Sequence, residues 1–159
     1  MNIIKAALII TLLSLPLFVS ASTEFNEALV DKILKSYRAA MQKQDVNKVA
    51  SHFIKSAKIE ITRYGKRGVE KLNLSQYKKM LKEQWSAGGK YKYKVIKRNK
   101  TKIIAENKYA HVLIILKEVI NNDKGSFSTK MSEAIFVINS GGVPKIKDVK
   151  YKMDSTYTR

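Results

Sequence analysis

The sequence predicts a single α+β domain in which helices come first and long strands follow. Early in the chain, apolar residues recur three and four positions apart, which is the spacing of amphipathic helices. In the second half they alternate with polar residues or form continuous runs, as in strands of a sheet. The 159 residues are 45% hydrophobic, enough for one core of ordinary size, and no low-complexity linker divides them. Helices grouped before strands favour a strongly curved antiparallel sheet that wraps around the first helix.

The first 21 residues have the pattern of a cleaved secretory signal. Lys5 gives the N-terminal segment a positive charge, and residues 6–19 are mainly apolar. Val19-Ser20-Ala21 then places small residues where signal peptidase cleaves. The apolar run is shorter than the ~20 residues that a bilayer-spanning helix needs. We therefore expect residues 22–159 to form one mature domain that is periplasmic or secreted and is not a transmembrane protein.

Two helices and a strand are expected after the signal. The apolar face over residues 28–41 predicts the first helix, and Asp45 is placed to cap a second, short helix over residues 46–53. Alternation over residues 58–62 then predicts a strand, in which Ile59 and Ile61 share one face.

A third helix and a series of strands complete the expected domain. The helix is predicted over residues 76–86, with Ser75 as its N-cap and Gly88-Gly89 at its end. The segment 109–120 is apolar on both faces, which indicates a central strand. The expected strands of this part cover residues 90–95, 109–120, 127–138 and 145–153.

One motif and the order of elements resemble a known superfamily. Tyr37-x-Ala39-Ala40-x(4)-Asp45, followed by Phe53, Ala57 and Glu60, is similar to the opening of bacterial ketosteroid isomerases and their SnoaL-like and DUF4440-like relatives. Over residues 28–154 the chain resembles the nuclear transport factor 2-like (NTF2-like) superfamily. The resemblance implies a cone-shaped α+β fold, in which the N-terminal helices and the concave sheet face enclose a cavity.

The resemblance also bears on catalysis. It implies that Tyr37 stands where the isomerases keep their oxyanion-stabilising tyrosine. Their general base, an aspartate on the first strand, corresponds without gaps to Ile61, and Glu60 is expected on the opposite face. A general base must lie within hydrogen-bond reach of the proton that it removes. The sequence therefore favours a non-enzymatic role and assigns no catalytic residue, unless a one-residue bulge turns Glu60 inward.

Several residues are candidates for a pocket that binds an apolar or aromatic ligand. Glu133 stands among apolar strand residues, either as a pocket acid or as the partner of a basic group. Each aromatic candidate belongs either to the core or to the wall of the pocket. His111 belongs either to the core or to the rim of the pocket. No cysteine and only two histidines are present, so no metal site and no cofactor are expected. The candidate ligand-binding residues are Tyr37, Met41, Trp85, Tyr91, Tyr93, His111 and Glu133.

The chain is strongly basic, with 31 Lys and Arg against 13 Asp and Glu and a formal charge of +18. On the strand at residues 90–95 the lysines fall on one face and the two tyrosines on the other, which favours a solvated face over a single-strand nucleic-acid site. Such a charge nevertheless attracts polyanions, including nucleic acid, without sequence specificity. The expected basic surface consists of Lys90, Lys92, Lys94, Lys97, Arg98, Lys100 and Lys102.

Three classes of function follow from these features. The favoured one is a non-enzymatic periplasmic binding or accessory protein that holds a small apolar ligand or an acidic protein. The second is a SnoaL-like isomerase or hydrolase that uses Tyr37 with Glu133 or His111. The third is a binder of envelope polyanions or acidic proteins, including an immunity-type partner. A homodimer is compatible with each class.

Overall fold

The computed structural model describes residues 25–63, 65, 67–88, 90–99, 101–104, 108–122 and 125–158, so the expected secretory signal lies outside the described residues. The elements, in chain order, are α1 (Glu27–Gln42), α2 (Val46–Ser51), β1 (Phe53–Thr62), β2 (Glu70–Asn73), α3 (Leu74–Ser86), β3 (Lys90–Arg98), β4 (Lys102–Ile104), β5 (Tyr109–Asn122), β6 (Gly125–Ser140) and β7 (Val143–Thr158).

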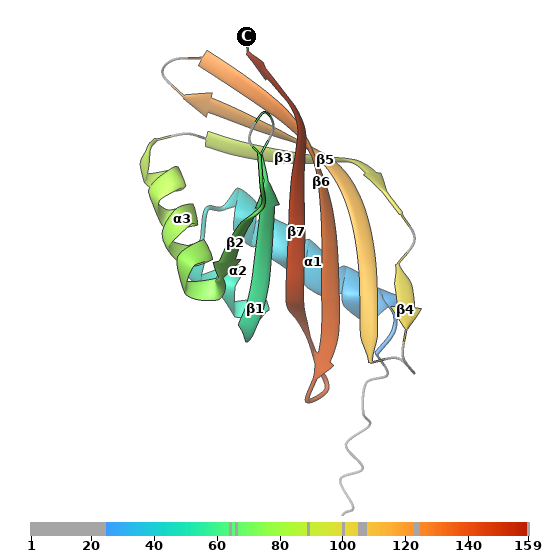
Figure 1. Ribbon diagram of the computed structural model, residues 1–159. Coiled ribbons are helices and arrows are strands. Elements are labelled where there is room, and N and C mark those ends of the chain that lie inside the picture. The colour runs from blue at the N-terminus through green and yellow to red at the C-terminus, as the bar shows by residue number, and fades with distance from the viewer. Residues whose placement is uncertain are drawn as a thin grey trace, which may run out of the picture.

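Within the described residues, seven strands form one sheet in the order β2-β1-β7-β6-β5-β3, and β4 pairs with β5. Figure 1 shows α1 crossing behind the sheet, with α3 beside β1 and β2. The predicted α+β architecture is confirmed. The sheet is mixed rather than wholly antiparallel, because β1 and β7 run parallel. The whole domain connects these two strands, so no tight hairpin constrains their relative direction.

The first helix forms because a cap and an apolar stripe coincide. The Asn26 side chain accepts a hydrogen bond from the Leu29 N–H at 3.0 Å, which satisfies one of the free donors at the helix start. Val30, Leu34 and Tyr37 then recur at helical spacing and are buried against the sheet. The side chain at position 37 therefore points to the concave face, as the sequence pattern predicts.

The third helix begins at Leu74, and its N-cap is Asn73 rather than the expected Ser75. The Asn73 side chain accepts from the Gln76 N–H, and the Gln76 side chain accepts from the Asn73 N–H, both at 2.9 Å. This reciprocal capping box satisfies two donors, which a cap at Ser75 would not do. Its position after β2 orients the following Tyr77 towards the core.

Two further boundaries differ from expectation. The short helix ends at Ser51, and Phe53 already belongs to β1, so the strand is longer than the expected 58–62. Pairing with β7 extends β1 at this end, since the Ile146 N–H donates to the His52 carbonyl at 2.8 Å. As predicted, Asp45 caps α2 by accepting from the Lys48 N–H at 2.9 Å.

The core lies between the concave face of the sheet and the helices α1 and α3. Ile59, Val149, Ile135 and Val112 are fully buried and stand in neighbouring positions on β1, β7, β6 and β5. They close the floor beneath the cavity described below. None of the helices in the described part of the chain is both long and apolar enough to span a membrane.

Candidate functional site

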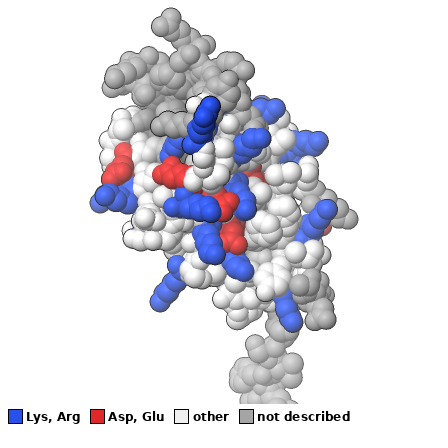
Figure 2. Space-filling view, in the orientation of Figure 1, with Lys and Arg blue, Asp and Glu red and all other residues white. Residues whose placement is uncertain are grey.

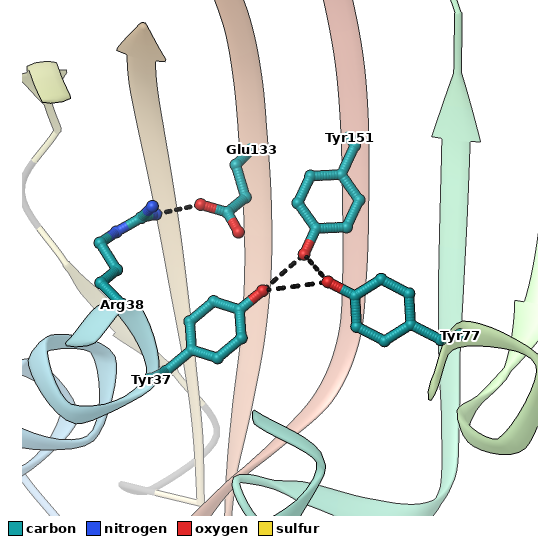
Figure 3. A network of polar contacts seen from close by, with 5 residues as sticks. All are labelled: Tyr37, Arg38, Tyr77, Glu133 and Tyr151. Carbon is teal, nitrogen blue, oxygen red and sulfur yellow. Dashed lines mark hydrogen bonds and ion pairs between the residues drawn. The ribbon is translucent and has the colours of Figure 1, made fainter. Parts of the chain in front are cut away.

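Three tyrosine hydroxyls meet on the concave side of the sheet (Figure 3). The Tyr151 hydroxyl lies 2.5 Å from that of Tyr37 and 2.8 Å from that of Tyr77, while the Tyr37 and Tyr77 hydroxyls are 3.4 Å apart. Hydrogen bonds between hydroxyls usually span about 2.5–3.0 Å, so the cluster contains two short bonds and one long contact. Three hydroxyls carry three protons and the two short bonds use two. Within the cluster the third proton has at most the long contact between Tyr37 and Tyr77, so it is the one that can turn to another acceptor.

Aromatic packing fixes the three rings, which come from α1, α3 and β7. The Phe53 ring meets Tyr37 edge-on with centroids 5.7 Å apart and meets Tyr77 in the same way at 5.8 Å. Tyr77 also stacks on Tyr151 at 6.2 Å. Edge-to-face and offset-stacked pairs are the favoured arrangements of aromatic rings. Residues distant in sequence are thus held with their hydroxyls together.

A buried ion pair lies beside the tyrosine cluster. Arg38, the residue after Tyr37, donates from Nη2 to the Oε2 of Glu133 (Figure 3). Glu133 is 1% exposed, and a carboxylate at that depth requires a charged or hydrogen-bonding partner. Glu133 and Tyr151 are direct cross-strand partners on β6 and β7. Glu133 thus lines the cavity and is paired with a basic group.

The environment keeps all three hydroxyls protonated. Burial raises the pKa of Tyr37 and of Tyr151 well above the usual value of about 10, and the neighbouring tyrosines and the Glu133 charge raise both further. Burial also raises the pKa of Tyr77 to about 12, although hydrogen bonds to the other two hydroxyls act in the opposite direction. At neutral pH the cluster is uncharged and can donate.

The same neighbours act on the arginine. Burial alone would lower the pKa of Arg38, but the Glu133 carboxylate outweighs that effect, so the pKa is raised. The guanidinium therefore stays charged, as its buried partner requires.

Two rows of side chains from the sheet form the wall of a cavity. Tyr151 and Glu133 make up the inner row, with Ile61 paired to Tyr151 from β1. Met153 and Met131, also cross-strand partners, form the next row towards the strand ends. The sheet therefore contributes one row of polar groups and one row of thioethers to the cavity.

Helices contribute two more thioethers, Met41 from α1 and Met80 from α3. Apart from Met1, these four are all the methionines of the chain. The centre of a water molecule can occupy about 60 Å³ of the cavity, while the whole hollow, including its open mouth, amounts to about 610 Å³. Methionine side chains are flexible and polarisable, so they form an adaptable apolar lining.

Charged groups stand near the mouth. Arg63 follows β1 and donates to the Glu70 Oε2 from Nε at 3.2 Å and from Nη2 at 2.9 Å. Glu118 on β5 is buried and also lines the cavity. Neither residue stood out in the sequence.

Ile61 lines the cavity at the position where the resemblance places a general base. Glu60 faces the outer side of the sheet, where its Oε2 lies 3.0 Å from the Lys150 Nζ. The regular register from Lys58 to Thr62 shows no bulge that would turn Glu60 inward. The cavity thus lacks a carboxylate at this position.

The structure brings together some of the candidate ligand-binding residues. Tyr37, Met41 and Glu133 line the cavity. Trp85 is buried in the core and does not line it, and its indole N–H has no hydrogen-bond partner among the described groups. The side chains of Tyr91 and Tyr93 lie outside the described part of the structure, although both residues belong to β3.

His111 lies on the opposite face of the sheet from the cavity. Its neighbours Ala110 and Val112 are buried towards the core, and the His111 ring stacks on Phe136 with centroids 4.5 Å apart. The other histidine, His52, caps the end of α2, with Nδ1 2.6 Å from the Lys48 carbonyl.

The residues of the expected basic surface differ in their surroundings. Lys92, Lys94, Lys97 and Lys102 are exposed. Arg98 instead donates to Asp31 and, at 3.0 Å, to the Thr101 hydroxyl. The side chain of Lys90 and the whole of Lys100 lie outside the described residues.

Sequence reasoning missed Arg38, Tyr151 and the role of Tyr77. Tyr77 lies within the predicted helix 76–86, but nothing in the sequence marks its hydroxyl. A signal for Tyr151 exists only in its alternation with Lys150 and Lys152, which indicates a half-buried strand position.

Solved structures of other proteins have a similar arrangement of helices and sheet. The chain is similar to an NTF2-like protein of unknown function from Pseudomonas putida, with a TM-score of 0.63 and 8% identity over 79% of this chain and 84% of that chain. This chain has the NTF2-like fold. The fold that the resemblance implies is therefore confirmed.

Two further structures share the NTF2-like fold. A ketosteroid isomerase-like protein from Erwinia carotovora atroseptica has a TM-score of 0.63 and 10% identity, covering 81% of this chain and 96% of its own. Hexachlorocyclohexane dehydrochlorinase LinA-type3 from Novosphingobium barchaimii has a TM-score of 0.68 and 12% identity, covering 83% and 88%. No protein-family model and no curated protein sequence matches the chain. Since one fold hosts many chemistries, the site must carry the functional argument.

Proposed function

We propose that the protein binds a small, mainly apolar molecule that presents one oxygen acceptor to the tyrosine cluster. The observation that carries this proposal is a set of three neutral hydroxyls with two short bonds, which leaves one proton to donate. Around it stand apolar side chains, and a few convergent polar groups within apolar walls are typical of small-molecule sites.

The size of the cavity limits the ligand. The space open to the centres of water molecules is about 60 Å³, so we expect a ligand of about one ring and a movement of the lining around anything larger. Methionine has three rotatable side-chain bonds and can make that space at small cost. We therefore expect the four cavity methionines to report directly on binding.

Binding is favoured over proton abstraction because the cavity has no carboxylate at position 61. Glu133 already accepts from Arg38 at Oε2, and protonation of the carboxylate would sacrifice this ion pair. General acid–base participation is worth ~10²–10⁴ in rate, so a cavity without a free base would retain little activity.

Isomerase-type chemistry is the second candidate. It is supported by Glu133, which is the cross-strand partner of Tyr151 and lines the same cavity. For this chemistry the ligand would have to displace Arg38 from the carboxylate.

We place this activity outside the cytoplasm, in the periplasm or beyond, as an accessory function. Support comes from the first 21 residues alone, which carry the signal-peptidase pattern Val19-Ser20-Ala21. The exported protein should begin at Ser22 on N-terminal sequencing. Recovery of chains that begin at Met1 from the membrane fraction would contradict this placement.

The binding proposal can be tested with a matched pair of probes. Cyclohexanone and cyclohexane have the same ring, but only the ketone accepts a hydrogen bond. With ¹³C-labelled methionine methyl groups, nuclear magnetic resonance titration should show both probes shifting the cavity signals. The ketone should bind about fivefold more tightly, the usual net value of one hydrogen bond of about 1 kcal/mol.

The control variants separate the cluster from other tyrosines. With Tyr37, Tyr77 and Tyr151 all replaced by Phe, the preference for the ketone should disappear while cyclohexane still binds. Tyr109→Phe makes the same chemical change at a residue that is 40% exposed and outside the cavity, and it should leave the preference intact. Equal affinity of both probes for the unmodified protein would rule out the cluster as the donor.

A further inference from the structure

Three lysines from neighbouring strands stand side by side on the outer face of the sheet. Lys117 on β5 is the direct cross-strand partner of Lys94 on β3 and of Lys130 on β6. All three are exposed, whereas Leu116 and Glu118 on either side of Lys117 are buried, so the lysines point away from the cavity. Neighbouring strands lie ~4.8 Å apart, which places three positive side chains along about 10 Å.

A second row extends this group towards the middle of the sheet. Lys97 pairs with Ile115, Ile115 with Ser132, and Ser132 with Lys152. Lys97 and Lys152 are exposed as well. We call the five residues Lys94, Lys97, Lys117, Lys130 and Lys152 the lysine array.

Acidic side chains do not balance the array within the part of the chain that the structure describes. Among the side chains that the structure describes on the outer face, the acidic ones are Glu60 on β1 and Asp148 on β7, and Glu60 is paired with Lys150. The side chain of Asp154, two residues after Lys152, lies outside the described part. Figure 2 shows this face, with acidic side chains near its middle and basic side chains spread around them.

Edge protection does not explain the array. Lysines on an edge strand discourage pairing with other chains, and this accounts for Lys94 and Lys97 on β3. Lys117 and Lys130 stand on interior strands, where no edge needs protection. Like charges directly opposite one another destabilise a sheet, so these positions carry a cost in the free protein. A negatively charged partner would remove that cost, whereas a second copy of the same face would increase it.

We propose that the lysine array docks the protein on an anionic lipid surface. The array covers four strands in two dimensions, as a field of headgroups does, whereas a linear polyanion follows one line. Ile96 lies in the irregular step of β3 between Lys94 and Lys97 and is 55% exposed. Apolar side chains flanked by lysines can enter the boundary between headgroups and acyl chains while the lysines meet the phosphates.

Vesicle flotation tests the proposal with residues 22–159, which contain every helix and strand that the structure describes. The probes are vesicles of phosphatidylglycerol and phosphatidylcholine in equal parts, and vesicles of phosphatidylcholine alone. The protein should bind the first and not the second, and binding should weaken as salt screens the charges. The array variant replaces Lys94, Lys117 and Lys130 by Gln. Each lysine near an anionic surface is worth about fivefold in affinity, so we expect about 100-fold weaker binding.

The matched control removes the same charge from another face. It replaces Lys32 and Lys35 on α1 and Lys82 on α3, all exposed, by Gln. This control should stay within about threefold of the unmodified protein, since the long-range effect of net charge is screened beyond about 10 Å. The array variant should also unfold at the same or a higher temperature, because it loses a like-charge repulsion.

Three results would overturn the proposal. The first is no binding to either vesicle, and the second is equal weakening in the array variant and the control, which would mean that net charge alone drives binding. The third is tighter binding to heparin or to a single-stranded oligonucleotide, lost in the array variant, which would assign the array to a linear polyanion. None of these results depends on the cavity or its ligand.

Discussion

The ion pair between Arg38 and Glu133 holds a carboxylate in the core that depends on its arginine partner. The Glu133 side chain is 2% exposed and that of Arg38 is 16% exposed. Replacing Arg38 by Met preserves an apolar stem but leaves a buried carboxylate without its partner. Unit charges about 3 Å apart attract by about 5–6 kcal/mol at an effective dielectric constant of about 20. Loss of one partner of a buried pair typically costs about 3–5 kcal/mol.

We expect Arg38→Met to lower the free energy of unfolding by about 3 kcal/mol. The value is at the low end because water can approach from the partly exposed Arg38 side. Glu133→Gln should cost about 1–2 kcal/mol, since the arginine left behind can hydrate. The double variant should be more stable than Arg38→Met alone, because no unpaired charge remains in the core. Urea unfolding followed by circular dichroism at pH 7 measures all three.

The matched control is Arg63→Met, which breaks the pair with Glu70. The Arg63 and Glu70 side chains are 37% and 43% exposed, so this change should cost less than about 1 kcal/mol. If Arg38→Met cost no more than Arg63→Met, or if the effects of Arg38→Met and Glu133→Gln simply added, the ion pair would not be what stabilises the buried carboxylate.

Three further predictions concern pH, capping and catalysis. The pKa of Tyr77 is raised to about 12, so the folded state keeps a proton that the unfolded chain loses above about pH 10. The resulting stability is present below pH 10, and about 2–3 kcal/mol of it is lost as the pH rises towards 12. In urea unfolding, Tyr77→Phe should make the free energy of unfolding fall less steeply over this range. The same fall in the variant and in the unmodified protein would contradict the prediction. Asn73→Ala should cost about 1 kcal/mol in thermal unfolding because it removes the capping box, while Ser75→Ala should stay within about 0.5 kcal/mol; a reversed order would mean that the cap is misassigned. Finally, a Δ5-steroid isomerisation assay should show no turnover. Robust turnover that is abolished by Glu133→Gln or Glu60→Gln would make the protein an enzyme and identify its base.

Much of the fold could be predicted because its signals are local. The stripe that includes Leu34 and Tyr37 follows the helical period, and Asp45 caps the next helix as its residue type suggests. The N-cap of α3 was misplaced because Asn73 and Ser75 are both good caps, and only the partner Gln76 distinguishes them. The parallel pairing of β1 with β7 has no local signal in the sequence. Nothing in the residues of either strand shows which strand lies beside it.

The candidate site was predictable only where a residue conflicted with its surroundings. Glu133 could be noticed because a charge stands among apolar strand residues, and Tyr37 through the resemblance. Tyr151 alternates with lysines just as Tyr93 does, so the sequence cannot tell which of these hydroxyls enters the cavity. Arg38 is one of 31 basic residues in the sequence. Only the folded structure shows which of them lies beside Glu133.

The position of β7 also determines when the chain can fold. This last strand lies between β1 and β6, so it joins the part formed by β1, β2 and α3 to the meander of β5 and β6. Ile59 pairs with Val149, about 90 residues later, and such non-local pairings fold slowly because a long loop must close first. A nascent chain cannot complete this sheet, or bring Tyr151 to the other two hydroxyls, until β7 has been synthesised. The sheet is therefore expected to stay open up to that point, and the cavity to form in a single step once β7 pairs with β1 and β6.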